Sequence, residues 1–360
     1  MKKSVLEFIV FLPSSKTLSY GWNLGSLLGM FLGLQLLTGV ILVFYYGPDT
    51  SFDGVQYIMY DVSWGWLVRI LHFNGASFFF FFLYMHVFKG FFMKSYRLVS
   101  VGETGILSWF LFMGVGFMGY VLVYSQMNFW AAVFLTSMLA VVPYLEKLWV
   151  FFFGGIYGVG DLTVNFFFVW LFLWPGVGAV WVLFLLIFLQ IKGKPSLLYC
   201  QGNKKKVIFF PYYGWKKKSG VWGIFFFLGF VFVSPFFWGN GKMFKNHKKW
   251  AKPGQIAPKG NFLFVYTIRR PIPKKFLGGY GKKSANGCPV GPGFFKVKGK
   301  SEVVKNSELF FVLVGGGLTW WGMNAPEVPY LLLSGGYPFF FFFFFFLGLY
   351  FWLGGLLKDC

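Results

Sequence analysis

Two histidines, His72 and His86, lie fourteen residues apart in an uncharged stretch of the sequence. Two pairs of glycines repeat this interval in the flanking apolar stretches: Gly25 and Gly39, and Gly105 and Gly119. On an α-helix, fourteen residues advance about 21 Å and end roughly 40° short of four turns, so each pair projects from one face at two depths. A histidine at each depth can ligate a metal, and glycines at the same depths leave room for a large planar ring. The spacing therefore predicts two flat metal cofactors at two levels between helices.

The elements that position these residues are predicted to be membrane-spanning helices. Of the 360 residues, 57% are hydrophobic and only 12% are charged, about half the charged fraction of a typical soluble domain. Seven uncharged blocks approach or exceed the ~20 residues that cross a bilayer, and they cover residues 17–48, 70–88, 104–145, 162–191, 219–241, 309–326 and 328–357. The block 104–145 is too long for one crossing. Its polar run from Ser125 to Asn128 and Pro143 indicate a span followed by a helix along the membrane surface.

The charged residues predict how the chain is oriented in the membrane. Lysines precede the first block, lysines and Arg97 separate the second from the third, and lysines follow the fourth between Lys192 and Lys218. The loop between the first two blocks carries Asp49, Asp53 and Asp61 and no lysine. The positive-inside rule therefore places the amino terminus on the negative side of the membrane. A net charge of +22 could also indicate nucleic-acid binding, but the aromatic residues are in the spans, so we expect no nucleic-acid partner and lysines that face lipid headgroups.

The cysteines and the amino terminus exclude several classes of protein. Cys200, Cys288 and Cys360 have no CxxC spacing, so the sequence predicts neither a zinc site, nor a c-type haem attachment, nor a disulfide framework. The start of the chain lacks an A-x-A-like cleavage site and an Arg- and Ser-rich import segment. We therefore expect a membrane protein that is made in the compartment where it is used.

Several ordered motifs resemble mitochondrial cytochrome b, the quinol-oxidising dihaem subunit of respiratory complex III. The resemblance is dense from about residue 18 to 147, patchy to 275, and returns at 320–330. The motifs that carry it are the run from Leu18 to Gly29, Asp61-Val62-Ser63-Trp64-Gly65-Trp66, Arg69-Ile70-Leu71-His72-Phe73-Asn74-Gly75, Leu83-Tyr84-Met85-His86, Gly119-Tyr120-Val121-Leu122, and Pro326-Glu327-Val328-Pro329-Tyr330.

The resemblance implies an all-α polytopic membrane protein with eight transmembrane helices and a four-helix dihaem core. It also implies an N-terminal dihaem bundle over 1–200 and a C-terminal part over 201–360, which carries further spans and the quinol-pocket loop. Such an enzyme subunit would oxidise ubiquinol on the positive side of the mitochondrial inner membrane and pass electrons through two b haems to quinone on the negative side, coupled to proton translocation. The implied partners are a Rieske iron-sulfur protein, a cytochrome c-type haem subunit, other complex III subunits, a second copy of the chain, and lipids including cardiolipin.

The resemblance also assigns residues to the two haems. His72 is expected to ligate the haem on the positive side and His86 the haem on the negative side. Gly25, Gly39, Gly105 and Gly119 are expected to leave room for the haem rings, and we call them clearance glycines. Arg69 and Lys89 match positions where the family places cations near haem propionates. The opposing ligand positions on the fourth span fall at Leu171 and Leu185 when Pro175 is aligned with the family's proline.

Two quinone pockets are implied by the same matches. The quinol-oxidation pocket would be lined by apolar walls that suit a quinone ring, formed by Met113, Phe117, Tyr120, Ala131, Ala132 and Leu135 on one side and Phe262 and Tyr266 on the other. The quinone-reduction pocket would use residues near the negative side, namely Asn23, Ser26, Gln190, Phe209, Lys216 and Lys217.

The sequence departs from the family pattern at positions that matter for chemistry. Leucine at 171 and 185 has no lone pair, whereas low-spin electron-transfer haem needs two strong axial ligands. The family's Pro-Glu-Trp-Tyr motif reads Pro258-Lys259-Gly260-Asn261, which removes a carboxylate, and Lys217 stands where an acid is expected. Residues 276–298 are too rich in lysine and glycine to form the expected sixth span, and Phe339 to Phe346 is an unbroken phenylalanine run. We hypothesise that part of this sequence was assigned from a density map rather than translated from a gene. The rival explanation is real divergence with altered haems.

Two other functions stay open at this point. A degenerate relative that binds haem or serves as a scaffold of a respiratory membrane complex would keep the packing and lose turnover. A polytopic transporter would need charged or broken helices at mid-membrane, and the uncharged cores of the first four blocks argue against it.

Overall fold

Long helices form most of the computed structural model, which describes residues 13–15, 18–92, 98–139, 159–192 and 206–251, together with isolated positions between 316 and 327. The chain divides into two compact units, Met1–Lys252 and Pro253–Cys360. The helices and strands described below all belong to the first unit. The functional division at residue 200 stays a prediction.

Four helices among the described residues are long and apolar enough to cross a membrane. They are α2 (Leu24–Val43, preceded by the 3-10 turn η1, Tyr20–Asn23), α4 (Gly65–Phe92), α5 (Val99–Val121) and α8 (Asp161–Lys192). They match the first four uncharged blocks of the sequence, so those spans are confirmed as helices of spanning length. Pro175 lies inside α8, and the helix continues past it to Lys192.

The fifth block forms a shorter helix than its length suggests. Helix α10 (Ser219–Val233) follows the short helix α9 (Tyr212–Lys217) and ends one residue before Ser234-Pro235. A proline ring restricts the residue before it to extended conformations, which explains the stop. The blocks 309–326 and 328–357 lie almost wholly outside the described residues.

The long third block, 104–145, separates into two helices, as the sequence predicts. Helix α5 ends at Val121, and α6 (Gln126–Leu139) begins after a tight turn. Tyr124 in this turn adopts a left-handed backbone with φ of 51°. The side chain of Asn128 donates to the carbonyl oxygen of Tyr120 and accepts a hydrogen bond of 2.7 Å from the Ser125 hydroxyl. These bonds satisfy polar groups at the turn, so the chain can change direction in an apolar setting.

A second tight turn leads into the histidine-bearing helix. The connection from α2 passes through η2 (Pro48–Thr50) and α3 (Ser51–Tyr60) before α4 begins at Gly65. Trp64 adopts a positive φ of 63°, and a Cβ at Gly65 would overlap the carbonyl oxygen of Ile58. Only glycine fits position 65, and this fixes where α4 starts relative to α3.

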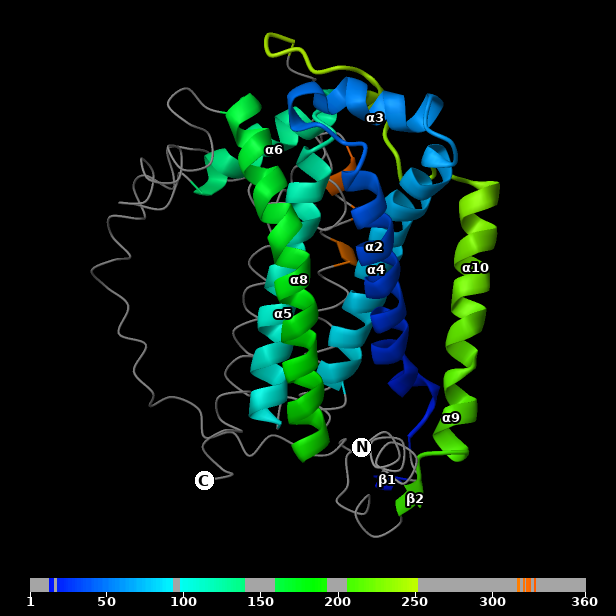
Figure 1. Ribbon diagram of the computed structural model, residues 1–360. Helices are drawn as coiled ribbons and strands as arrows, with labels where there is room; N and C mark the ends of the chain where they lie inside the picture. The colour runs from blue at the N-terminus through cyan, green and yellow to red at the C-terminus, as the bar shows by residue number, and fades with distance from the viewer. Residues whose placement is uncertain are drawn as a thin grey trace, which may run out of the picture. The chain divides into compact units, whose positions relative to one another are not determined.

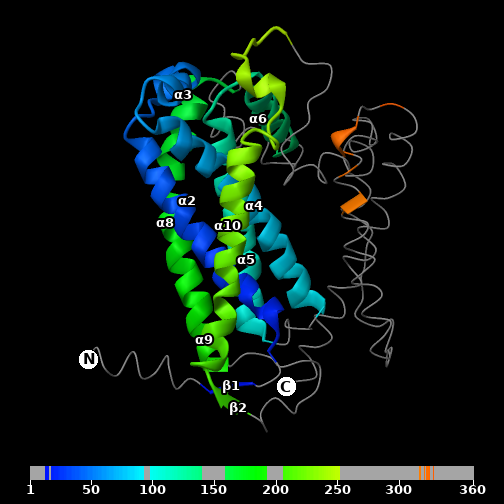
Figure 2. The same cartoon turned by 90° about the vertical axis from the view of Figure 1, so that its right-hand side faces the viewer.

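The two ends of the bundle carry different elements. Helices α3 and α6 lie at one end (Figures 1 and 2). At the other end the two-stranded antiparallel sheet of β1 (Pro13–Ser15) and β2 (Lys206–Ile208) lies beside α9, with Ser14 opposite Val207. The 3-10 turn η5 (Gly241–Phe244) returns the chain to the α6 end.

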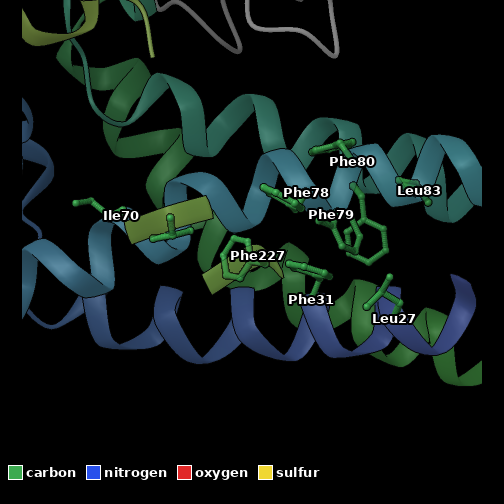
Figure 3. Close-up of a cluster of buried hydrophobic side chains, with 10 residues drawn as sticks. Leu27, Phe31, Ile70, Phe78, Phe79, Phe80, Leu83 and Phe227 are labelled. Carbon is green, nitrogen blue, oxygen red and sulfur yellow. The ribbon is translucent and has the colours of Figure 1, made fainter. Parts of the chain in front are cut away.

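The helices pack as two close pairs. Helix α2 lies against α4 and α5 lies against α8, while α10 covers α2 and α4. Figure 3 shows the buried cluster between α2, α4 and α10, in which Phe31, Phe78 and Phe227 meet with ring centroids 5.1 to 6.0 Å apart. A second buried cluster, which includes Val121, Phe129 and Phe167, lies towards the α6 end. This pairing places the predicted ligand positions and the predicted clearance glycines on adjacent helices.

Candidate functional site

Each histidine of α4 faces one of the two clearance glycines of α2, Gly25 and Gly39. A Cβ built at Gly39 would lie 3.2 Å from Cε1 of His72, and one built at Gly25 would lie 3.4 Å from Cε1 of His86. A side chain at either glycine would therefore press on the imidazole at the same level. The fourteen-residue interval shared by the two helices thus aligns two residue pairs in space.

The other helix pair repeats this arrangement. A Cβ at Gly119 would lie 3.7 Å from Cδ2 of Leu171, and one at Gly105 would lie 3.7 Å from Cδ1 of Leu185. The positions that the resemblance assigns to the opposing axial ligands therefore face the clearance glycines of α5, just as the histidines face those of α2. The geometry agrees with the alignment on Pro175, although leucine cannot ligate a metal.

The ring of His72 is oriented by Thr38, which the sequence reading did not single out. The Thr38 hydroxyl lies 2.8 Å from Nδ1 of His72 and 2.7 Å from the carbonyl oxygen of Leu34. A hydroxyl has one proton, and the Leu34 carbonyl can only accept it, so Nδ1 of His72 donates to the hydroxyl oxygen. In this tautomer the lone pair is on Nε2, which is the form that a metal-ligating histidine needs. The position of Thr38 directly before Gly39 was the available sequence signal.

His86 is buried in a different way. Its Nδ1 atom is buried without a hydrogen-bond partner among the described residues. An unsatisfied buried polar atom costs free energy, and such atoms in native structures call for an explanation such as a bound group. A haem-ligating histidine binds the metal through Nε2 and donates from Nδ1, so the unpartnered Nδ1 does not itself mark a ligand. The position of His86 opposite Gly25 is what matches the predicted ligand level.

Two cations lie near the histidines along α4. Arg69 is one turn from His72 and its guanidinium lies 5.9 Å from the centroid of the Phe73 ring. Lys89 is one turn from His86 and its ammonium lies 4.2 Å from the centroid of the Trp22 ring. Arg69 precedes His72 and Lys89 follows His86, so each cation lies on the outer side of its histidine along α4.

The described residues contain no group of three or more His, Cys, Asp or Glu side chains that could hold a bare metal ion. A tetrapyrrole supplies four nitrogen ligands itself and asks the protein only for axial ones. The residues of α4 fit this requirement at both levels, and those of α8 do not.

Most of the predicted quinone-reduction residues gather at the β1–β2 end. Asn23 donates through Nδ2 to the carbonyl oxygen of Lys216 at 2.7 Å, and Lys216 donates through Nζ to the carbonyl oxygen of Leu18 at 3.2 Å. Ser26 bonds to the carbonyl oxygen of Asn23 at 2.8 Å. The ammonium of Lys217 lies 4.8 Å from the Phe209 ring centroid, whereas Gln190 lies exposed near the end of α8.

The predicted first wall of the quinol-oxidation pocket is divided between two clusters. Phe117 and Ala132 belong to the buried cluster near α6, where the Phe117 and Phe167 ring centroids are 5.7 Å apart, and Met113 packs against the other cluster. Ala131 is fully buried and Tyr120 is partly buried. The side chain of Leu135, and the second-wall residues Phe262 and Tyr266, lie outside the described residues, as does Lys259.

His247 has a position that the sequence did not predict. Its ring centroid lies 4.4 Å from that of Tyr124 and 5.2 Å from that of Phe129. Gln126 holds the same segment through its backbone N–H to Lys245 and its side-chain oxygen to the N–H of Lys248. The loop after α10 is thereby docked onto the start of α6.

Comparisons with known proteins agree with this architecture. Residues 9–193 match the family model described as cytochrome b/b6/petB. A cytochrome b of Caenorhabditis elegans is 41% identical over 366 residues, covering 98% of each chain, and one of Caenorhabditis briggsae is 47% identical over 286 residues, covering 77% of each. A solved structure titled "Hyperthermophilic respiratory Complex III" superposes with a TM-score of 0.82, at 23% identity, over 96% of this chain and 94% of that one. With the helices of spanning length and the facing pairs described above, these matches establish that the chain is a membrane protein of the cytochrome b family.

Proposed function

We propose that the chain is the dihaem, quinol-oxidising subunit of respiratory complex III, an eight-helix protein of the mitochondrial inner membrane. The observation that supports it most is the fourfold repeat of one contact. At two levels on each of two helix pairs, a glycine faces the position that the resemblance assigns to an axial ligand. Ordinary close packing can account for a single glycine. A matched set at one interval is better explained by room for two flat rings.

His72 and His86 would each hold one haem b by an axial imidazole. Thr38 keeps His72 in the tautomer that presents Nε2. Arg69 and Lys89 would neutralise the propionates, whose charge is costly in a low dielectric. Haem b, when bound, supplies one-electron transfer, and the protein supplies position and electrostatics.

The chain's residues would bind quinol at the α6 end and quinone at the β1–β2 end. The apolar walls from α5 and α6 suit a quinone ring, with Tyr120 in the last turn of α5. At the opposite end, Asn23, Ser26 and Lys216 are joined by hydrogen bonds and offer polar groups to the quinone carbonyl oxygens. Oxidation of quinol releases two electrons and two protons on the positive side, and reduction of quinone takes up protons on the negative side.

The proposed partners follow from this reaction. A Rieske iron-sulfur protein and a cytochrome c-type subunit would accept the electron that does not cross the membrane. The other complex III subunits, a second copy of this chain, and cardiolipin would complete the assembly. Exposed lysines at the β1–β2 end, among them Lys206 and Lys218, would face anionic headgroups.

A dithionite-reduced minus oxidised spectrum of the purified complex tests the proposal. Two b-type components are expected, and His72→Leu and His86→Leu should each remove one of them. His247→Leu is a matched control, because His247 lies in the loop beside α6 and should leave both components intact. Absence of any b-type component in the unmodified complex would sink the proposal.

The second candidate is a non-catalytic haem-binding or scaffold subunit. The specific observation in its favour is the leucines that face Gly119 and Gly105 in place of ligands. Intact b haems with quinol:cytochrome c turnover would favour the first function, and a complex without turnover would favour the second.

A further inference from the structure

A layer of side chains lies midway between the two histidine levels. Seven residues separate position 79 from both His72 and His86, and the same interval separates position 112 from Gly105 and Gly119. Seven residues are about 20° short of two helical turns, so these positions project from the same faces as the ligand and clearance residues. They are occupied by Phe79 and Phe112.

The two phenylalanines meet in the structure. Their ring centroids are 5.2 Å apart at an interplanar angle of 72°, the edge-to-face arrangement that aromatic pairs favour. Each is 6% exposed. They come from α4 and α5, which belong to different helix pairs, so the contact bridges the interior of the bundle between the two levels.

A glycine on the neighbouring helix α8 leaves room for the Phe112 ring. Position 178, midway between Leu171 and Leu185 on α8, is Gly178, and a Cβ there would lie 2.9 Å from Cε1 of Phe112. At the two outer levels a glycine faces a ligand position, whereas at this middle level a glycine makes room for an aromatic ring.

We propose that Phe79 and Phe112, beside Gly178, are positioning residues that form a dry partition between the two haem levels. This inference rests on the proposed function. An apolar layer between two redox centres keeps water out and the local dielectric low, and the apolar shell around a metal site controls solvent access and redox potential. Both haems would border this layer, so a change in the layer should alter the midpoint potential of each.

The test is a potentiometric titration of the b haems in the assembled complex carrying Phe79→Ala or Phe112→Ala. We expect both midpoint potentials to shift and the α absorption band of each haem to broaden. The reason is that a void in the partition admits water or lets the haems move. Phe31→Ala and Phe227→Ala are matched controls. That pair is also edge-to-face at 5.2 Å, and each ring is 1% exposed, but it lies between α2 and α10. The controls should leave both potentials unchanged.

A double-variant cycle guards against variants that fail to fold. Gly178→Ala should displace Phe112 and shift both potentials, and adding Phe112→Leu should restore them by relieving the overlap. Unchanged potentials and band shapes in Phe79→Ala, Phe112→Ala and Gly178→Ala, with two haems retained, would overturn the partition and leave the proposed function standing. Fewer than two b haems in the unmodified complex would instead overturn the proposed function.

Discussion

The hydroxyl of Thr38 lies 2.8 Å from Nδ1 of His72, and the same hydroxyl donates to the carbonyl oxygen of Leu34. This chain of two hydrogen bonds joins the helix of the clearance glycines to the helix of the histidines. Because the acceptor at its end is a backbone carbonyl in the preceding turn of α2, the direction of both bonds is determined. The imidazole is therefore presented with a defined tautomer before any ligand binds.

Replacing Thr38 by valine removes this orientation with little change in volume. We expect Thr38→Val to weaken haem binding at the His72 level by about 10- to 100-fold, the usual cost of losing an outer-shell partner of a ligating histidine. Global stability should fall by only about 1 kcal/mol, the worth of one hydrogen bond. Haem content and the midpoint potential of each b haem measure the effect. Thr38→Ser should behave as the unmodified protein, and an equal loss at both levels would contradict the assignment.

Filling a clearance position should remove one haem and spare the other. In Gly39→Leu the new side chain meets the His72 ring, since even a Cβ there would lie 3.2 Å from Cε1. Gly33→Leu on the same helix is the matched control, because a Cβ at Gly33 has no atom within 4 Å among the described residues. Pyridine haemochromogen assays should report about one haem fewer per chain in the first variant and none lost in the second.

The identities of residues 171 and 185 can be determined by sequencing the native protein or its gene. Leu171 and Leu185 face Gly119 and Gly105 in the geometry of a ligand beside a clearance position. Because low-spin electron-transfer haem needs two axial ligands, we expect gene sequencing or peptide mass spectrometry to show histidine at both positions. Codons for leucine would defeat this expectation. The haems would then be five-coordinate, and Leu171→His and Leu185→His should convert them to the low-spin form, as absorption spectra would show.

Acidification should loosen the loop that carries His247. Burial of the ring, reinforced by Lys249, lowers the pKa of His247 from its ordinary 6.5, and Asp161 and the Tyr124 backbone offset this only in part. The undocked loop therefore takes up a proton more readily than the docked one. Docking is fully stable above the ordinary pKa and weakens as the pH falls through the lowered value.

Hydrogen exchange at the amides of Gln126 and Lys248, which are bonded across this contact, measures the docking. After correction for the intrinsic pH dependence of exchange, their protection should drop on acidification. His247→Phe keeps an aromatic ring between Tyr124 and Phe129 and removes the titration, so its protection should not depend on pH. Protection that rises on acidification would contradict the predicted weakening of loop docking at low pH.

The sequence by itself determined the class of the protein and the two-level plan of its interior. Uncharged blocks of spanning length predict helices because a bilayer leaves no other partner for backbone groups, and four of those blocks are confirmed. The interval between His72 and His86 predicts two depths on one face because helix geometry is periodic. The same periodicity makes position 79 a midpoint, but periodicity alone does not say what lies opposite it.

Only the tertiary structure decided which residues meet across helices. Three contacts depend on helix rotation and on how the loops return: Thr38 with His72, His247 with Tyr124, and Phe79 with Phe112 beside Gly178. Those quantities are set by packing between segments far apart in the chain, whereas local residue order constrains only its own helix. Composition and spacing thus specify which side chains each helix places on a given face. The packing of the bundle specifies which residues of other helices contact them.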